Sequence, residues 1–314
     1  MTLEDTLTTE DYDEFGWLRE VAHDHGLAFE PPKVWRRFHE LSPGRLLSAI
    51  QWGEASPRVV LLHGGRQNAH TWDTVLLELA QPALAIDLPG HGRSYRRPDG
   101  DHGAIQAAAA LAQALPQLAP DAEVLIGMSL GALTAMRLMA TARPARKVVL
   151  LDATPPVSAE IVDRSRAAER GVADVERLER YDSFEALLHV AAALNPRRPL
   201  RALRRETRLN VMRLVDGSWT WRHDAGSRRP THPENWAQMF GLWDDVAAID
   251  APTLLVKAQY SRFVSDDSVA EFRRRLPSAR VEVVANSGHA IQYDQPRALT
   301  ALINDFCFPN AEVS

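Results

Sequence analysis

The chain has 314 residues, of which 45% are hydrophobic, and its 36 basic and 41 acidic side chains leave a formal charge of −5. A chain of this size can bury a full core in two domains, or in one large domain with an insertion. It carries no basic field that would attract nucleic acid, and its single cysteine, Cys307, excludes an internal disulfide and favours a reducing compartment.

Residues 1–31 form an acidic N-terminal extension. A secretory signal would need a basic start and an apolar middle, and neither is present. No apolar stretch in the chain approaches the roughly 18 residues of a membrane span. We therefore expect a soluble, cytoplasmic protein. Within the extension, residues 13–25 predict a short helix, and the whole segment is expected to be a solvated, partly ordered arm.

Apolar runs alternate with helical patterns along the rest of the chain. Residues 34–41 and 46–52 predict two strands joined by a Ser-Pro-Gly turn. Further strands are expected at 58–62, 83–86, 123–126, 147–151, 252–256 and 281–284. Helices are expected at about 71–79, 104–115, 132–138, 266–276 and 296–306. Continuous apolar strands separated by helices are typical of a parallel sheet that is covered on both faces, which is an α/β fold.

Residues 155–246 interrupt this alternation. They contain no strong buried strand, apart from a possible hairpin strand at 217–222, and are rich in arginine and tryptophan. Because the strands resume afterwards, we interpret the segment as a mostly helical cap inserted into a core of residues 32–154 and 247–314. Its arginines form either a solvated helix face or an entrance that attracts anionic substrates. They are Arg197, Arg198, Arg201, Arg204, Arg205 and Arg208.

The pentapeptide Gly-Met-Ser-Leu-Gly at residues 127–131 stands between an apolar strand and a helical pattern. Gly-x-Ser-x-Gly in this setting is typical of a nucleophile elbow. Its glycines flank a turn that is too tight for side chains. The serine lies at the head of a helix, where backbone N–H groups face any oxyanion that forms. The pattern predicts that Ser129 is a nucleophile.

Four motifs, in this order, resemble the α/β-hydrolase fold from about residue 34 to residue 308. They are His-Gly-Gly at 63–65, Asp-Leu-Pro-Gly-His-Gly-Arg-Ser at 87–94, the pentapeptide at 127–131 and Ser-Gly-His at 287–289. Residues 67–73 and 241–246 are similar to a group of actinobacterial, especially mycobacterial, capped esterases. The resemblance implies hydrolysis of carboxylic esters through an acyl-enzyme, with a small-molecule ester as substrate. The sequence has no Walker loop and no ligand-spaced cluster of His and Cys, so we expect no metal or organic cofactor.

The resemblance also assigns roles to single residues. A serine hydroxyl is nearly inert at neutral pH and needs a base, and similar enzymes place that base in the loop that holds His289. The oxyanion hole takes one backbone N–H from Leu130 and a second from the loop after the third strand, here Gly65 or alternatively Arg66. His70 lies near the site by its sequence context and is a candidate substrate-binding residue.

The acid of the triad departs from the common pattern. Most relatives carry an aspartate just after the strand that follows the cap, where this chain has Tyr260. The fold has a known alternative at the end of the strand after the elbow helix, where Asp152 stands and could orient His289. Asp266 and Asp267 stay open as alternatives, although a helix start favours capping, and so does a triad without an acid.

Other readings of the function also remain open. A thioesterase or lactonase would use the same residues, and a non-catalytic binding protein could have kept the fold. Haloalkane dehalogenases and epoxide hydrolases are excluded, because both need a carboxylate at the elbow. The cap tryptophans either line an acyl pocket, with Trp219 and Trp243 as candidate substrate contacts, or form the cap core. They are Trp219, Trp221, Trp236 and Trp243.

Overall fold

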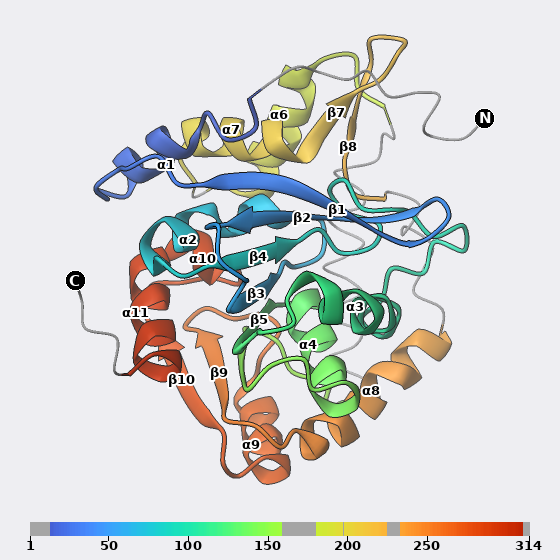
Figure 1. The fold of residues 1–314 in the computed structure, drawn as a ribbon, viewed down its shortest axis with the longest axis vertical. Coiled ribbons are helices and arrows are strands. Elements are labelled where there is room, and N and C mark those ends of the chain that lie inside the picture. Colours follow the sequence, from blue (N-terminus) through green and yellow to red (C-terminus); the bar gives the residue numbers. More distant parts are fainter. Residues whose placement is uncertain (1–12, 159–179, 197, 225–232, 310–314) are drawn as a thin grey trace.

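The computed structural model describes residues 13–158, 180–196, 198–224 and 233–309. In this part of the chain a mostly parallel sheet has the strand order β1-β2-β4-β3-β5-β6-β9-β10 (Figure 1). Its strands are β1 (Val34–Ser42), β2 (Arg45–Trp52), β3 (Val59–Leu62), β4 (Ala83–Ile86), β5 (Val124–Met128), β6 (Lys147–Leu151), β9 (Thr253–Ala258) and β10 (Arg280–Val284). Only β2 pairs antiparallel, with β1 on one side and β4 on the other. The predicted α/β-hydrolase fold is confirmed.

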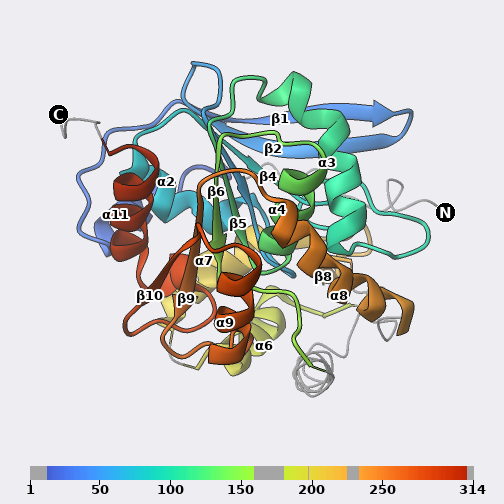
Figure 2. The same cartoon turned by 90° about the horizontal axis from the view of Figure 1, so that it is seen from below.

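Helices cover both faces of the sheet (Figures 1 and 2). One face packs against α1 (Leu18–Asp24), α2 (Asp73–Leu79) and α11 (Pro296–Cys307). The other packs against α3 (Ala104–Leu118), α4 (Leu130–Thr141), α8 (Pro233–Ala248) and α9 (Asp266–Arg275). Between β3 and α2 lies the short 3-10 helix η2 (Ala69–Trp72), and α10 (Ile291–Asp294) precedes α11.

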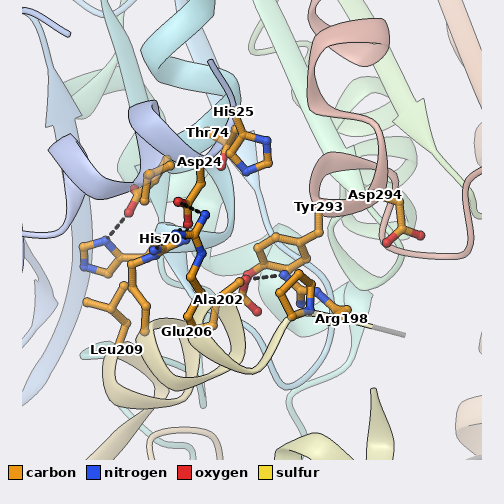
Figure 3. Close-up of a pocket in the computed structure, with 15 residues that line it drawn as sticks. Asp24, His25, His70, Thr74, Arg198, Ala202, Glu206, Leu209, Tyr293 and Asp294 are labelled. Carbon is orange, nitrogen blue, oxygen red and sulfur yellow. Dashed lines mark hydrogen bonds and ion pairs between the residues drawn. The ribbon is translucent and has the colours of Figure 1, made fainter. Parts of the chain in front are cut away.

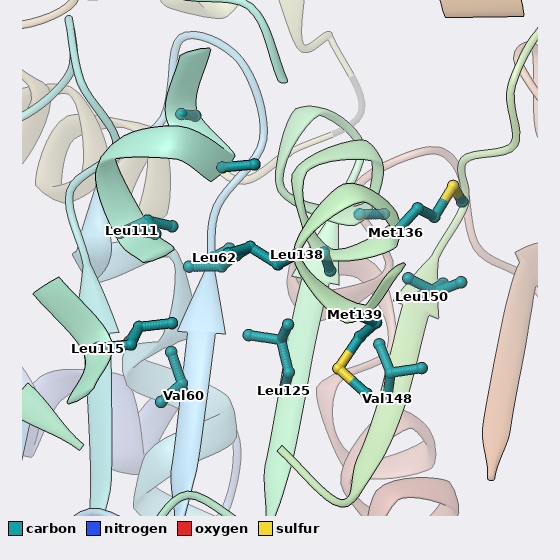
Figure 4. Close-up of a cluster of buried hydrophobic side chains, with 14 of the residues drawn as sticks. Val60, Leu62, Leu111, Leu115, Leu125, Met136, Leu138, Met139, Val148 and Leu150 are labelled. Carbon is teal, nitrogen blue, oxygen red and sulfur yellow. The ribbon is translucent and has the colours of Figure 1, made fainter. Parts of the chain in front are cut away.

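The two hydrophobic cores follow from the pleat of the central strands. Successive side chains of a strand point to opposite faces, so Val60 and Leu62 of β3 face α3 and α4, while Val59 and Leu61 face the opposite layer. Figure 4 shows the first of these cores, in which Leu125 of β5 lies beneath the helices. This arrangement explains why the central strands are apolar throughout rather than alternating with polar residues.

Residues 155–246 contribute two kinds of structure. Helix α6 (Phe184–Leu194) shares a small separate core with the hairpin of β7 (Val211–Arg213) and β8 (Trp219–Trp221). This hairpin confirms the strand expected near 217–222. Helix α7 (Leu200–Asn210) lies beside α6. Helix α8, in contrast, packs against α4 and α9 in the helical layer on the sheet (Figure 2).

The N-terminal segment is fixed to the core from residue 13 onward, and this corrects the expectation of a solvated arm. Helix α1 is shorter than predicted and buries Leu18, Val21 and Ala22. The Glu14 carboxylate bonds the Arg36 guanidinium at 2.8 Å, and Arg36 in turn bonds Asp87 at 2.8 Å. The partners of Glu14 are Arg36 of β1, His70 of η2 and Arg93 of the loop after β4, so the local charge pattern could not reveal them. Residues 1–12 of the predicted arm lie outside the described residues.

No helix in the described part of the chain is both long and apolar enough to cross a membrane.

Candidate active site

Ser129 lies at the sharp turn between β5 and α4, as the pentapeptide predicts. Its φ of 50° is in the left-handed region, and its N–H donates to the carbonyl oxygen of Leu151 at 3.0 Å. A Cβ at Gly127 would collide with the backbone of Gly131, and one at Gly131 would collide with Leu62. Only glycine fits both positions, and Ser129 itself is held in a conformation that costs about 1–3 kcal/mol.

The side chains of Asp152 and His289 lie within hydrogen-bond distance of each other. The Nδ1 atom of His289 lies 2.8 Å from Oδ2 of Asp152, which is fully buried at the end of β6. Asp152 also has a positive φ, of 45°. Because the buried carboxylate accepts, the Nδ1 of His289 carries a proton and its Nε2 is left as the basic atom. The structure therefore brings together the two residues that the resemblance paired.

The alternative acids are placed elsewhere. Asp266, the first residue of α9, is 97% exposed and pairs with Lys257. Asp267 follows it in the first turn of the same helix. At the position where relatives carry the acid, Tyr260 is exposed. This arrangement leaves Asp152 as the carboxylate bonded to His289.

Ser261 also belongs to this site, although the sequence did not indicate a role for it. Its Oγ lies 2.9 Å from Oδ2 of Asp152 and accepts the backbone N–H groups of Phe263 and Val264. Since two N–H groups occupy its lone pairs, the hydroxyl hydrogen must point to Asp152. The other oxygen, Oδ1, accepts the N–H of Ala258 at 2.9 Å. The only signal in the sequence was a small hydroxyl residue next to the displaced acid position.

The loop after β3 passes directly beside Ser129. A Cβ at Gly64 would lie 3.3 Å from the Cβ of Ser129, whereas one at Gly65 would meet open space. The loop closes on itself, because the N–H of Gly64 donates to Oε1 of Gln67 at 3.0 Å. No residue that the structure describes accepts a hydrogen bond from the N–H of Gly65 or Leu130. These two donors are thus available for an oxygen that enters beside Ser129.

His63 supports this loop through both ring nitrogens. Its Nε2 accepts the N–H of Leu88 at 2.9 Å, so the proton is on Nδ1, which donates to the carbonyl oxygen of Gly64 at 2.7 Å. Burial lowers the pKa of His63, and the ring stays neutral near pH 7. A neutral ring can make both bonds, because it donates with one nitrogen and accepts with the other.

The three candidate substrate residues have internal partners. Burial opposes the charged form of His70, but the carboxylates of Asp73 and Glu14 at its two ring nitrogens raise its pKa. Trp243 is buried against Phe272 and donates its indole N–H to the carbonyl oxygen of Pro156 at 2.9 Å. Trp219 is half-buried in β8, where its ring packs against Phe184 and the guanidinium of Arg208.

Four of the arginines at residues 198–208 pair with carboxylates, although Arg201 and Arg204 stay 60% and 48% exposed. Arg198 pairs with Glu206 and Arg204 with Glu185, both within the cap segment. Arg201 and Arg205 both pair with Asp24 of α1, and Arg205 also with Glu20. This pairing favours a structural role over an anion-attracting entrance. Arg197 lies outside the described residues.

A polar cavity of about 280 Å³ lies between α1, α2, α7 and α10 (Figure 3). Acidic and basic side chains both line it, among them Asp24, Arg198 and Glu206. Burial raises the pKa of Glu206 to about 7, against the opposing effect of Arg198. Ser129, His289 and Gly65 are not among the lining residues, so this cavity is distinct from the elbow.

Comparison with known proteins identifies the family. The profile of the alpha/beta hydrolase family matches residues 59–302. The chain is also 43% identical to the esterase Rv0045c of Mycobacterium tuberculosis over 294 residues, which is 93% of this chain and 94% of that one. The chain belongs to the alpha/beta hydrolase family. The predicted resemblance to mycobacterial esterases is confirmed.

Solved structures agree with this assignment. A structure of the M. tuberculosis esterase Rv0045c superposes with a TM-score of 0.82 at 42% identity, covering 94% of this chain and 98% of the other. The structure of E-2-(acetamidomethylene)succinate hydrolase superposes with a TM-score of 0.74 at 22% identity, covering 87% and 98%. The second likeness is at the level of the fold alone.

Proposed function

We propose that this hydrolase cleaves carboxylic esters with Ser129 as nucleophile, His289 as base and Asp152 as acid. The observation that carries the proposal is the 2.8 Å hydrogen bond from Nδ1 of His289 to the buried Asp152, in a chain whose Ser129 has the strained elbow conformation. The 43% identity to an esterase supports ester hydrolysis as the reaction class.

The proposed reaction follows from the tautomer of His289. Asp152 holds the proton on Nδ1, so Nε2 can take the hydroxyl proton of Ser129 as its oxygen attacks the ester carbonyl. The N–H groups of Leu130 and Gly65 then stabilise the oxyanion, each contributing roughly 3 kcal/mol to transition-state stabilisation.

Collapse of the tetrahedral intermediate breaks the bond to the alcohol. His289 returns the proton to the departing oxygen, and the acyl group stays on Ser129. A water molecule then gives its proton to Nε2 and attacks the acyl-enzyme, which releases the carboxylic acid and restores the hydroxyl of Ser129. Each proton that His289 takes up is delivered within the same half-reaction, first to the departing alcohol and then to the oxygen of Ser129.

We further propose that residues 155–246 act as a cap on the core of residues 32–154 and 247–314, with residues 1–31 as an extension. The separate core shared by α6 and the β7–β8 hairpin supports this division, whereas α8 at the end of the segment joins the helical layer on the sheet. Trp219 is the best candidate of the three for a substrate contact, because Trp243 and His70 are occupied by internal hydrogen bonds. A cytoplasmic location stays a prediction.

The test is turnover of p-nitrophenyl esters by wild type and Ser129→Ala, with an acyl thioester and a lactone assayed in parallel. We expect turnover that the alanine variant loses, together with labelling of wild type alone by a fluorophosphonate. Faster turnover of the thioester or lactone than of the esters would leave the roles of Ser129, His289 and Asp152 unchanged but assign a different substrate class. Equal rates for both proteins, without labelling, would leave a non-catalytic binding protein.

A further inference from the structure

Asn210 connects the cap segment to the loop that holds the second oxyanion donor. It is the last residue of α7, and its side-chain Nδ2 donates to the carbonyl oxygen of Arg66 at 2.7 Å. Asn68, two residues beyond Arg66, donates from Nδ2 to Oδ1 of Asn210 at 3.2 Å and to the carbonyl oxygen of Leu209 at 3.0 Å. These three bonds join segments that are more than 140 residues apart in the chain.

The orientation of both amides is fixed by this network. The Oδ1 of Asn68 accepts the N–H of His70 at 3.0 Å, which turns Nδ2 of Asn68 toward α7. That donor requires the oxygen of Asn210 to face it, so the amino group of Asn210 faces Arg66. An asparagine at position 210 thus accepts on one side and donates on the other.

The peptide that Asn210 holds needs an external partner. Arg66 has a φ of 63°, in the left-handed region that favours glycine. It lies between Gly65 and Gln67, inside the turn in which the N–H of Gln67 donates to the carbonyl oxygen of Gly64 at 3.3 Å. A strained residue of this kind persists only where its surroundings fix it. The bond from Asn210 supplies that constraint on the cap side of the turn.

Helix α7 is itself anchored to the core, so it can act as a fixed support. Arg205 bonds Asp24 and Glu20 of α1. The Arg198 guanidinium lies over the ring of Tyr293 in α10, 4.0 Å from its centroid, at the other end of the cavity in Figure 3. The position of Asn210 is therefore set by contacts that involve neither Ser129 nor His289.

We propose that Asn210 is a positioning residue for the oxyanion hole: it fixes the turn at Arg66 and so the N–H of Gly65, which couples the cap to transition-state stabilisation. This inference rests on the proposed function of Gly65. It assigns to the cap a part in the rate of the chemical step, in addition to any part in substrate binding.

The test compares Asn210→Ala and Asn210→Asp with Asn195→Ala. Asn195 caps the end of α6, and among the described residues its side chain bonds only the carbonyl oxygen of Ala191 in the same helix turn, at 3.0 Å. Loss of a complete oxyanion donor lowers kcat about 100- to 1,000-fold, so for a loosened one we expect a fall in kcat of roughly 10-fold. KM should change by less than about threefold, since the donor acts mainly in the transition state.

Asn210→Asp keeps the shape and the acceptor for Asn68 but cannot donate to Arg66, so it should lose as much activity as Asn210→Ala. Asn195→Ala should stay within about twofold of wild type, with kcat expressed per site titrated by a fluorophosphonate. Wild-type kcat in Asn210→Asp would overturn the proposal. A rise in KM with unchanged kcat would also overturn it. If Asn210→Ala does not fold, the kcat of the isosteric Asn210→Asp variant alone tests the proposal.

Amide hydrogen exchange in the peptide spanning residues 63–72 gives a readout that does not depend on catalysis. Exchange there should be faster in Asn210→Asp than in wild type and unchanged in Asn195→Ala. Unchanged exchange in both would also overturn the proposal. If Ser129→Ala retained full turnover, the proposed function would fail, while the exchange experiment would still report whether Asn210 holds the turn.

Discussion

The hydroxyl of Ser261 donates to Oδ2 of Asp152, the same oxygen that accepts from Nδ1 of His289, at distances of 2.9 and 2.8 Å. Ser261 stands one residue after Tyr260, where most relatives carry the acid. A hydroxyl from that loop therefore supports a carboxylate that comes from the neighbouring strand. With Ala258 bonded to Oδ1, Asp152 is held by donors on both oxygens, and its plane is fixed relative to the imidazole.

Asp152→Asn should lower kcat by several orders of magnitude, to the scale of about 10⁴-fold seen when a triad aspartate is replaced by asparagine. An amide that donates to Nδ1 would leave the proton on Nε2, where it cannot accept from Ser129. The melting temperature and kcat are measured together, with Asp266→Asn as the control. Near-wild-type turnover in Asp152→Asn would exclude Asp152 as the acid of the triad.

Ser261→Ala should lower kcat by a smaller factor, roughly 10-fold, because Asp152 keeps His289 but loses one of its orienting bonds. Ser261→Thr retains the hydroxyl and should recover most of the rate. Ser56→Ala is a matched control, since Ser56 makes the same type of bond to Asp121 at 2.9 Å on the surface. If both alanine variants lost equal activity, a positioning role for Ser261 would be refuted.

Glu206→Gln should change how stability depends on pH. Burial raises the pKa of Glu206 to about 7, so the folded state keeps the proton at pH values where the unfolded chain has lost it. The contribution of this group to stability therefore falls as pH rises from about 4.5 to about 7, by at most about 3 kcal/mol. Glutamine removes this slope and should stabilise the protein at pH 8 relative to wild type.

Urea unfolding at pH 5.5 and pH 8 measures this difference. Glu185→Gln is the control, because Glu185 pairs with Arg204 on the surface of the same segment. The hydrogen bond from Arg204 lowers the pKa of Glu185, so it stays ionised over this range and adds no slope. Equal pH dependence in wild type and Glu206→Gln would contradict the prediction.

Local pattern was sufficient for much of the active site. The strand, turn and helix around Ser129 follow from a short sequence with its own periodicity, and His289 from a motif after the last strand. Asp152 could be inferred because adjacent parallel strands end at the same edge of the sheet. Ser261 and Asn210 could not, since their bonds to Asp152 and Arg66 span 109 and 144 residues and leave no local signature.

The N-terminal segment shows the same limit. Its acidic composition indicates a solvated arm, yet the side chain of Glu14 is mostly buried and forms an ion pair with Arg36, which lies 22 residues further along the chain. The charge of one residue does not show whether the fold brings an oppositely charged residue next to it. The cap arginines show the same limit from the basic side. Their charge indicated a solvated face or an anion entrance, but it did not reveal that Asp24 of α1 pairs with Arg201 and Arg205.

Glu14→Ala should destabilise the protein even though it lies far from Ser129 in the sequence. Bonds from His70 and Arg36 outweigh the effect of burial and hold the pKa of Glu14 well below its usual value. The stabilisation from this carboxylate is thus complete at neutral pH and is lost as pH falls through its folded pKa. Removing one partner of a buried ion pair costs about 3–5 kcal/mol, and the remaining bond from Arg36 to Asp87 should keep the loss at the lower end.

Unfolding in urea at pH 7 measures this loss, with Glu54→Ala as the control. Glu54 pairs with Lys33 at 4.0 Å, and both side chains are exposed, so its removal should cost less than about 1 kcal/mol. Arg36 still bonds Asp87, and His70 still lies in η2, the helix that Asn68 caps. The Glu14 variant should therefore unfold at a lower urea concentration than wild type, without a change in KM. An equal effect of the two substitutions would show that Glu14 contributes no more than a surface pair.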